Sequence, residues 1–214
     1  MKIAILCSDP LHPVMEHLID WSKMQSSLGH EIIIVDNKSD LVSGDFLFLI
    51  SCSQIIEKAI LKNFKYSLVL HASDLPKGRG WSPYIWSILN GEHTITVSLL
   101  EVAEKVDTGR IWLKKQFALE GHELAAEINN LLFKTEVDLM SEAIENHYQI
   151  QPYEQRGDPT YWVRRLPNDS RLDPNKTISE QIDLLRVADN NRYPCFFDHR
   201  GHRYLIKIEK ANNE

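Results

Sequence analysis

Short apolar runs alternate, over most of the chain, with stretches in which apolar residues recur at helical spacing. The apolar runs predict strands at 2–7, 31–35, 45–50, 68–70, 94–100 and 110–119. The periodic stretches predict helices at 14–28, 55–62, 83–89 and 124–147. Strands that alternate with helices in this way indicate an α/β fold with a doubly wound, mostly parallel sheet.

The pattern changes after His147. Residues 151–176 contain four prolines and Gly157 but few aliphatic residues, which is typical of a linker or of an extended arm on the surface. Residues 177–214 predict a short helix and then a β-hairpin with Gly201 in its loop. We therefore divide the chain into a main domain at 1–150, an arm at 151–176 and a small C-terminal appendage at 177–214.

Composition narrows the possible partners. The chain has 214 residues and a formal net charge of -6, which argues against a nucleic acid because phosphate neutralisation needs clustered Lys and Arg. Cys7, Cys52 and Cys195 lie far apart in or beside apolar runs and are expected to be buried thiols. His199 and His202 lack further ligands at metal-binding spacing, so no metal is predicted. We expect a cytoplasmic protein that does not bind membranes, because neither a signal peptide nor a long apolar run occurs.

Residues 66–112 carry the candidate chemistry. The predicted strand at 68–70 ends on His71, and a loop with a proline and two glycines follows it. Open α/β sheets bind their ligands at the carboxyl ends of strands. The loop after the strand at 94–100 adds the carboxylates of Glu101, Glu104 and Asp107. The stretch therefore predicts a site at which a histidine meets carboxylates.

Short motifs within this stretch, spread over about forty residues, resemble the signature of the 10-formyltetrahydrofolate-dependent formyltransferases. The motifs are His71-Ala72-Ser73, Leu75-Pro76, Arg79-Gly80, Asn90-Gly91 and Asp107-Thr108-Gly109. The resemblance implies the Rossmann-like fold of that family, an N-formyltransferase activity and 10-formyltetrahydrofolate as the formyl donor.

The resemblance also implies roles for two residues. His71 would transfer protons and stabilise the oxyanion, and Asp107 would be the carboxylate beside it. A histidine suits this work because its ordinary pKa of about 6.5 lets it exchange protons near neutrality. Asp107 has a plainer interpretation as the cap of its own turn. The family usually carries an asparagine two residues before the histidine, where this chain has Val69. The candidate replacements for the missing donor are Ser51, Ser53 and Ser73.

By the same resemblance, two loops hold the folate largely through backbone groups. The residues concerned are Ser53, Gln54, Ile55, Val102, Ala103, Glu104 and Val106. The candidates for binding the acceptor substrate are Ser8, His12, Lys77, Arg79 and Trp81. Backbone N–H groups at a helix start hold anions, and an arginine offers phosphate a bidentate fork. Every one of these residues also fits a plain loop or a solvated surface.

The sequence of residues 70–112 and the hairpin appendage resemble those of the nucleotide-sugar N-formyltransferases. This branch acts on UDP- or dTDP-linked 4-amino-4,6-dideoxy sugars for bacterial surface glycans, as in the pseudaminic acid pathway. Similar appendages help those enzymes to dimerise, so we expect a homodimer. Methionyl-tRNA formyltransferase is disfavoured because its second domain is basic whereas this chain is acidic. Two alternatives stay open, namely a non-catalytic folate- or nucleotide-sugar-binding relative and a formyltransferase for another small amine.

Overall fold

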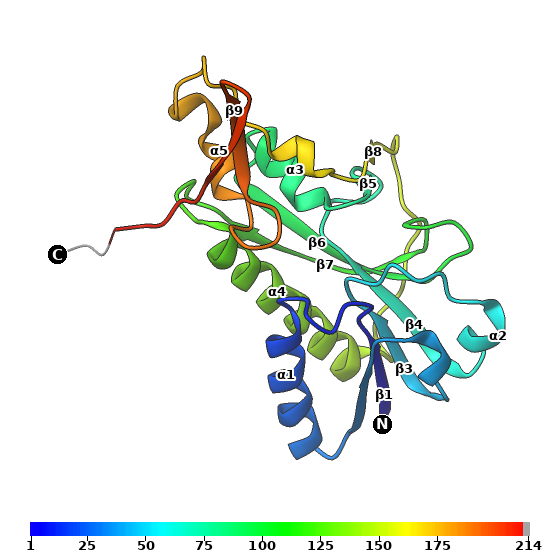
Figure 1. Cartoon of the computed structure of the whole chain (residues 1–214). Helices are drawn as coiled ribbons and strands as arrows, with labels where there is room; N and C mark the ends of the chain where they lie inside the picture. Colours follow the sequence, from blue (N-terminus) through cyan, green and yellow to red (C-terminus); the bar gives the residue numbers. More distant parts are fainter. Residues whose placement is uncertain (212–214) are drawn as a thin grey trace.

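The computed structural model describes residues 1–211, so residues 212–214 of the predicted appendage lie outside the described residues. A six-stranded sheet forms the centre of the molecule (Figure 1). Its strands, in spatial order, are β2 (Glu31–Val35), β1 (Lys2–Leu6), β3 (Gly44–Leu49), β4 (Phe64–His71), β6 (Thr94–Glu101) and β7 (Ile111–Ala118). The first four strands are parallel, and β6 runs antiparallel to both β4 and β7. The predicted α/β fold class is confirmed.

The helices bury the apolar faces that their sequence spacing creates. Their bounds are α1 (Met15–Ser27), α2 (Lys58–Leu61), α3 (Pro83–Leu89), α4 (Ala125–Asn146) and α5 (Ile182–Arg186). Short 3-10 turns occur at Lys38–Asp40, Pro167–Ser170 and Ser179–Gln181. Helices α1 and α4 lie together on one face of the sheet, where Leu18, Trp21 and Met140 pack against Phe48 and its neighbours (Figure 1). None of the described helices is long and apolar enough to cross a membrane.

The opposite face of the sheet is covered mainly by loops. A smaller apolar cluster there joins Leu6, Leu49 and Ile56, and helix α2 lies at its edge. Because side chains alternate along a strand, the residues of β4 that point to this face are Ser67, Val69 and His71. The thinner cover leaves room for a polar site at the ends of the strands.

The predicted arm packs on the main domain. It begins with a bridge between Tyr153 and Ile111 and then forms strand β8 (Tyr161–Trp162), which pairs in parallel with β5 (Arg79–Gly80). Gly80 has a φ of +103°, and a Cβ there would stand 2.3 Å from the carbonyl oxygen of Trp162. Only glycine allows this approach, so the second glycine of the loop after β4 is explained by the arm. The sequence pattern predicted neither of these two short strands.

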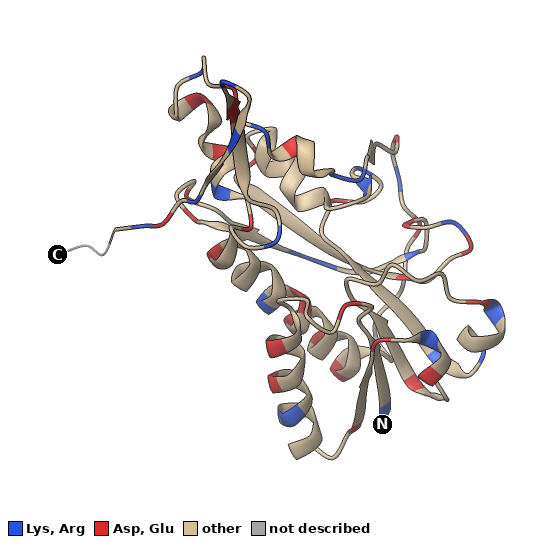
Figure 2. Ribbon diagram, viewed as in Figure 1, with Lys and Arg blue, Asp and Glu red and all other residues tan. Residues whose placement is uncertain are grey.

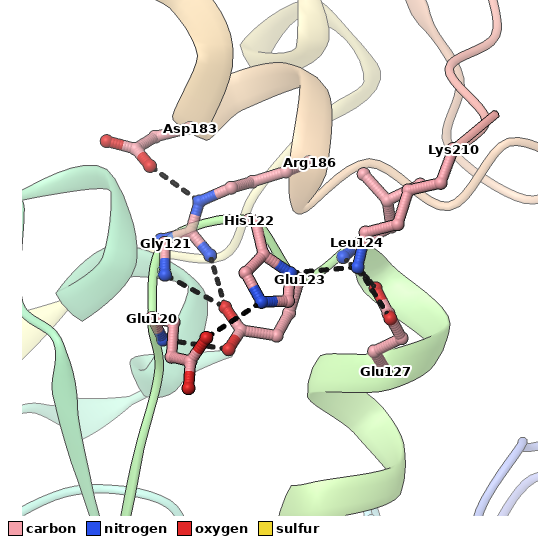
Figure 3. Close-up of polar contacts among 9 residues, drawn as sticks. All are labelled: Glu120, Gly121, His122, Glu123, Leu124, Glu127, Asp183, Arg186 and Lys210. Carbon is pink, nitrogen blue, oxygen red and sulfur yellow. Dashed lines mark hydrogen bonds and ion pairs between the residues drawn. The ribbon is translucent and has the colours of Figure 1, made fainter. Parts of the chain in front are cut away.

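The C-terminal appendage docks at the start of α4. Its hairpin consists of β9 (Cys195–His199) and β10 (His202–Ile206), in which His199 and His202 pair with each other in the register. The side chain of Arg186 is only 2% exposed, donates to Asp183 and lies 3.9 Å from the carboxylate of Glu123 (Figure 3). Lys210 adds a hydrogen bond to Glu127 on α4 (Figure 3). The three cysteines are free thiols, as expected, and Cys52 is only partly buried.

Candidate active site

His71 and Asp107 meet at the end of strand β4. His71 is the last residue of β4, and Asp107 lies in the loop between β6 and β7, the next two strands of the sheet. The Nδ1 atom of His71 is 3.5 Å from Oδ1 of Asp107, and the two side chains are 8% and 6% exposed. The structure therefore brings together the two residues that the sequence predicted to be catalytic.

A second contact fixes how the imidazole is used. The Nε2 atom of His71 is 2.9 Å from the carbonyl oxygen of Gly78. A carbonyl oxygen only accepts hydrogen bonds, so Nε2 carries a hydrogen in this contact. The nitrogen that faces the carboxylate of Asp107 is Nδ1.

Asp107 adopts a backbone conformation that few residues tolerate. Its φ is +58°, in the left-handed region, which aspartate visits more readily than most non-glycine residues. Its Oδ2 accepts a hydrogen bond of 2.9 Å from the amide of Gly80. A Cβ on Gly109 would stand 1.8 Å from the carbonyl of Glu101, so only glycine fits there. The Asp107-Thr108-Gly109 motif is thus required by this turn as well as by the carboxylate.

Val69 lies on the same face of β4 as His71 but offers no hydrogen-bond donor. It is half-buried and packs against Leu75 and Leu100. Of the candidate replacements, Ser73 is 6% exposed, and its hydroxyl is buried without a hydrogen-bond partner. Ser51 and Ser53 are exposed in the loop after β3. Their roles as donors remain predictions.

The two loops predicted to hold the folate flank β4, because one follows β3 and the other follows β6. An exposed ion pair of 3.2 Å joins Lys58, the first residue of α2, to Glu104 of the second loop. Ile55 and Val106 are 68% and 64% exposed, so each loop presents an apolar side chain. Gln54 binds the backbone of Asp36 and Lys38 with its side chain, which fixes the first loop to the end of β2. Loops with exposed apolar side chains and backbone groups suit the flat heterocycle of a folate.

The side chains of Val102 and Ala103 differ in exposure. Val102 packs into the apolar cluster beneath the first loop, and its amide bonds to the carbonyl of Ser67. Ala103 is exposed. The hydroxyl of Ser8 accepts a hydrogen bond of 2.9 Å from the amide of Ser53, so the loop after β1 supports the first folate loop. The binding roles of these residues remain predictions.

His12 lies in the loop that leads from β1 into α1. Its Nδ1 accepts a hydrogen bond from the amide of Val14 at the start of α1. Burial lowers the pKa of His12, Arg192 lowers it further and Asp9 opposes the change. A hollow of about 300 Å³ lies beside it, lined by Pro10, Leu11, His12, Pro13, Met15 and Glu16.

The loop after His71 holds the other predicted substrate residues, and the arm covers it. Lys77 is exposed, and Trp81 is 47% exposed. Arg79 donates to Oε1 of Gln155 at 2.6 Å and to the hydroxyl of Tyr161 at 3.3 Å. The guanidinium expected to contact phosphate is therefore bound by the arm.

Sequence reasoning missed the contribution of the arm to the site. The hydroxyl of Thr160 accepts from the amide of Gly78, and the carbonyl of Trp162 accepts from the amide of Trp81. Trp162 also stacks on Trp86 with ring centroids 5.6 Å apart. The available signal was the stretch Pro159-Thr160-Tyr161-Trp162, whose aromatic residues are unusual in a free linker.

Comparison with known proteins identifies the family. The model of the family described as formyl transferase matches residues 14–144. The chain belongs to the formyl transferase family. A methionyl-tRNA formyltransferase from Clostridium beijerinckii is 32% identical over an alignment of 213 positions, and the alignment covers 89% of this chain and 68% of that protein.

Two solved structures share the fold of this chain. A 4-N formyltransferase from Francisella tularensis superposes with a TM-score of 0.76 at 18% identity and covers 99% of this chain and 98% of its own. HypX from Aquifex aeolicus in complex with tetrahydrofolic acid has a TM-score of 0.81 at 19% identity, over 97% of this chain and 37% of its own.

Membership of the family confirms that the chain is an enzyme, a formyltransferase that uses a formyltetrahydrofolate donor. The predicted enzymatic reaction class and donor are therefore confirmed. The predicted nucleotide-sugar branch is not confirmed, because relatives that match the chain in sequence are named as methionyl-tRNA formyltransferases.

Proposed function

We propose that this formyltransferase formylates the amine of a nucleotide-linked 4-amino-4,6-dideoxy sugar, such as a UDP-linked sugar of the pseudaminic acid pathway. The observation that carries the catalytic part is the buried His71–Asp107 pair at the end of β4, between the two loops suited to a folate. The acceptor class rests on the chemistry around the loop at 76–81 and on the charge of the chain.

His71 and Asp107 divide the proton chemistry. When bound, the donor supplies the formyl carbon, and an attacking amine has to lose a proton. Nδ1 of His71 takes or returns that proton, and Asp107 stabilises the imidazolium that forms. The same imidazolium offers positive charge to a developing oxyanion, which matters here because Val69 supplies no donor. Burial of the pair strengthens these interactions, since little water screens them.

The surroundings of Trp81 support a sugar nucleotide as acceptor. Trp81 is 47% exposed and has the guanidinium of Arg164 4.9 Å above its ring. An exposed indole can stack on a base or a sugar ring. Lys77 in the same loop is exposed and available to a phosphate. A small acceptor would therefore meet both a stacking surface and a positive charge.

The charge distribution favours a small acceptor over a nucleic acid. The formal net charge is -6, and Lys and Arg are spread among Asp and Glu over the ribbon instead of gathering in one area (Figure 2). Proteins that bind nucleic acids usually carry a basic patch. Methionyl-tRNA remains the second candidate acceptor because the curated relative at 32% identity is named for it.

The test is incubation with 10-formyltetrahydrofolate and a panel of UDP- and dTDP-4-amino sugars, with methionyl-tRNA as a further member. Mass spectrometry reads the products. We expect one amino sugar to gain a formyl group in a reaction that His71→Ala abolishes. Formylation of methionyl-tRNA with no sugar product would overturn the proposed acceptor and leave the catalytic pair in place.

We further propose that the protein is a cytoplasmic homodimer that associates through the C-terminal hairpin. Tyr204 and Leu205 on β10 are 47% and 58% exposed, and Tyr204 stacks on Phe197 of β9. Because consecutive side chains of a strand point to opposite faces, each face of the hairpin presents an exposed apolar side chain that a second copy can bury. Light scattering should give a dimer for the wild type and a monomer for Leu205→Asp. A wild-type monomer would contradict the proposal.

A further inference from the structure

Gln155 joins the arm to both halves of the candidate active site. Its Nε2 donates two hydrogen bonds of 2.9 Å, one to the carbonyl of Asp107 and one to the carbonyl of Gly109. Its Oε1 accepts from Arg79 at 2.6 Å. One half-buried amide therefore uses its donors on the loop of Asp107 and its acceptor on the loop that follows His71.

The contacts of Gln155 lie where the backbone of the Asp107 loop is constrained. Asp107 has a φ of +58°, and Gly109 lies against the carbonyl of Glu101. Two carbonyls that are two residues apart converge on a single NH₂ group, which holds the turn in this shape. The direction of the Asp107 side chain follows from the turn, because its carboxylate must reach both the amide of Gly80 and the imidazole of His71.

We propose that Gln155 is a positioning residue that holds the Asp107 carboxylate against His71. This proposal rests on the proposed catalytic role of His71 and Asp107. Gln155 acts through the backbone of Asp107 and Gly109. Residues 151–163 of the arm are therefore a functional part of the active site. A shift of about 1 Å in a catalytic group can cost about a hundredfold in rate, so a loosened turn has a large effect.

The variant Gln155→Glu separates the donor function from mere arm docking. Glutamate keeps the length of the side chain and the acceptor for Arg79, but it loses both donors and turns a carboxylate toward two carbonyls. We expect kcat to fall about 10- to 100-fold while the KM values for donor and acceptor stay within about twofold. The matched control is Gln151→Glu, an exposed glutamine in the same arm, which should leave kcat and KM at wild-type values.

A second readout needs no substrate. The amide of Gly80 donates to Oδ2 of Asp107, so hydrogen–deuterium exchange at Gly80 reports the position of the carboxylate. Exchange should be faster in Gln155→Glu than in the wild type or in Gln151→Glu. If Gln155→Glu does not fold, Gln155→Asn keeps the amide but draws it back by one methylene, and it should show the same two changes.

The outcomes distinguish this inference from the proposed acceptor. An enzyme that formylates no member of the panel would overturn the proposed acceptor, while exchange at Gly80 would still decide the role of Gln155. Unchanged exchange at Gly80, or a raised KM with unchanged kcat, would overturn the positioning role and leave Gln155 as a docking contact of the arm.

Discussion

The segments that follow α4 dock on the main domain in two different ways. The arm uses backbone groups and the neutral side chains of Gln155 and Thr160, and its contacts reach the loops that carry Gly78 and Asp107. The appendage uses charged side chains at the start of α4, with Arg186 at its centre (Figure 3). Hydrogen bonds between neutral groups fix the positions of the loops without adding charge to the site. A buried ion pair, in contrast, costs much free energy to break.

This difference assigns different consequences to the two regions. The arm contacts surround His71 and Asp107, so changing them should alter the rate. Arg186 binds Asp183 and faces Glu123, so changing it should alter stability. Variants in the two regions should therefore separate an effect on the rate from an effect on stability.

The largest effect is expected at the catalytic pair. Asp107→Asn keeps the size of the side chain but removes the negative charge that stabilises the protonated imidazole. We expect kcat to fall about a thousandfold, within the usual range for the loss of acid–base catalysis. Thermal unfolding should change by only a few degrees. Comparable kcat values for wild type and variant would remove Asp107 from the mechanism.

On the appendage side, Arg186→Met should lower the free energy of unfolding by about 2–3 kcal/mol, because the Glu123 carboxylate keeps its backbone hydrogen bonds but loses the guanidinium charge that faces it. The formylation rate per folded molecule should match the wild type. Urea denaturation and activity are measured on the same samples. Arg203→Met is the control, since Arg203 is 57% exposed, pairs with Asp198 at the surface and should cost less than about 1 kcal/mol. A reduced rate with unchanged stability in Arg186→Met would contradict the separation.

Helix α4 contains a buried carboxyl group that no described residue pairs with. Burial raises the pKa of Glu136 to about 8 from an ordinary value of 4.5, and its Oε2 has no hydrogen-bond partner among residues 1–211. The folded state therefore binds the extra proton between these values, so stability falls as pH rises from about 4.5 to about 8. Glu136→Gln should flatten this dependence and raise stability at pH 9 by about 2–4 kcal/mol. The measurement is urea unfolding of the wild type and Glu136→Gln at several pH values. The same pH dependence of stability in both proteins would contradict the prediction.

Glu123 on the appendage side should show the opposite behaviour. Burial acts to raise its pKa, but hydrogen bonds from the amides of Glu120 and Gly121 outweigh burial and lower it below the ordinary value. Its contribution to stability is present above the ordinary carboxyl pKa and is lost as pH falls through the lowered value. Glu123→Gln should therefore lose stability at neutral pH and converge with the wild type in acid. Equal stability at neutral pH would show that the backbone hydrogen bonds contribute nothing.

The smallest effect is expected at Val69. An asparagine at this position would place a donor on the face of β4 that carries His71. We expect Val69→Asn to raise kcat up to about tenfold, less than the full value of an oxyanion donor because the side chain enters an apolar setting. Steady-state kinetics with Val69→Leu as a control tests this, and no gain would mean that other groups already supply the donor.

The sequence predicted those parts of the molecule that leave a local pattern. Strand β2 covers the predicted residues, and helix α3 begins at Pro83 and ends at Leu89 as expected. His71 and Asp107 were found because each ends a strand or a turn within a recognisable motif. The fold and the proximity of His71 and Asp107 therefore follow from periodicity and motif together.

Contacts between distant segments left no such pattern. Gln155 lies in a stretch whose proline content is typical of a linker. Strands β5 and β8 are too short to show an alternation of apolar and polar residues. Arg186 and Glu123 are each ordinary charged residues, and only the docking of α5 on α4 buries them together. Glu136 could have been suspected, because it shares a helical face with Phe133 and Met140.

The most direct test of the account is a double-mutant cycle between Gln155→Glu and Asp107→Asn, read by single-turnover formyl transfer. If Gln155 acts only by placing the Asp107 carboxylate, the double variant should be as slow as Asp107→Asn alone. Rate losses that multiply in the double variant would show that Gln155 acts independently of Asp107 and would contradict its positioning role.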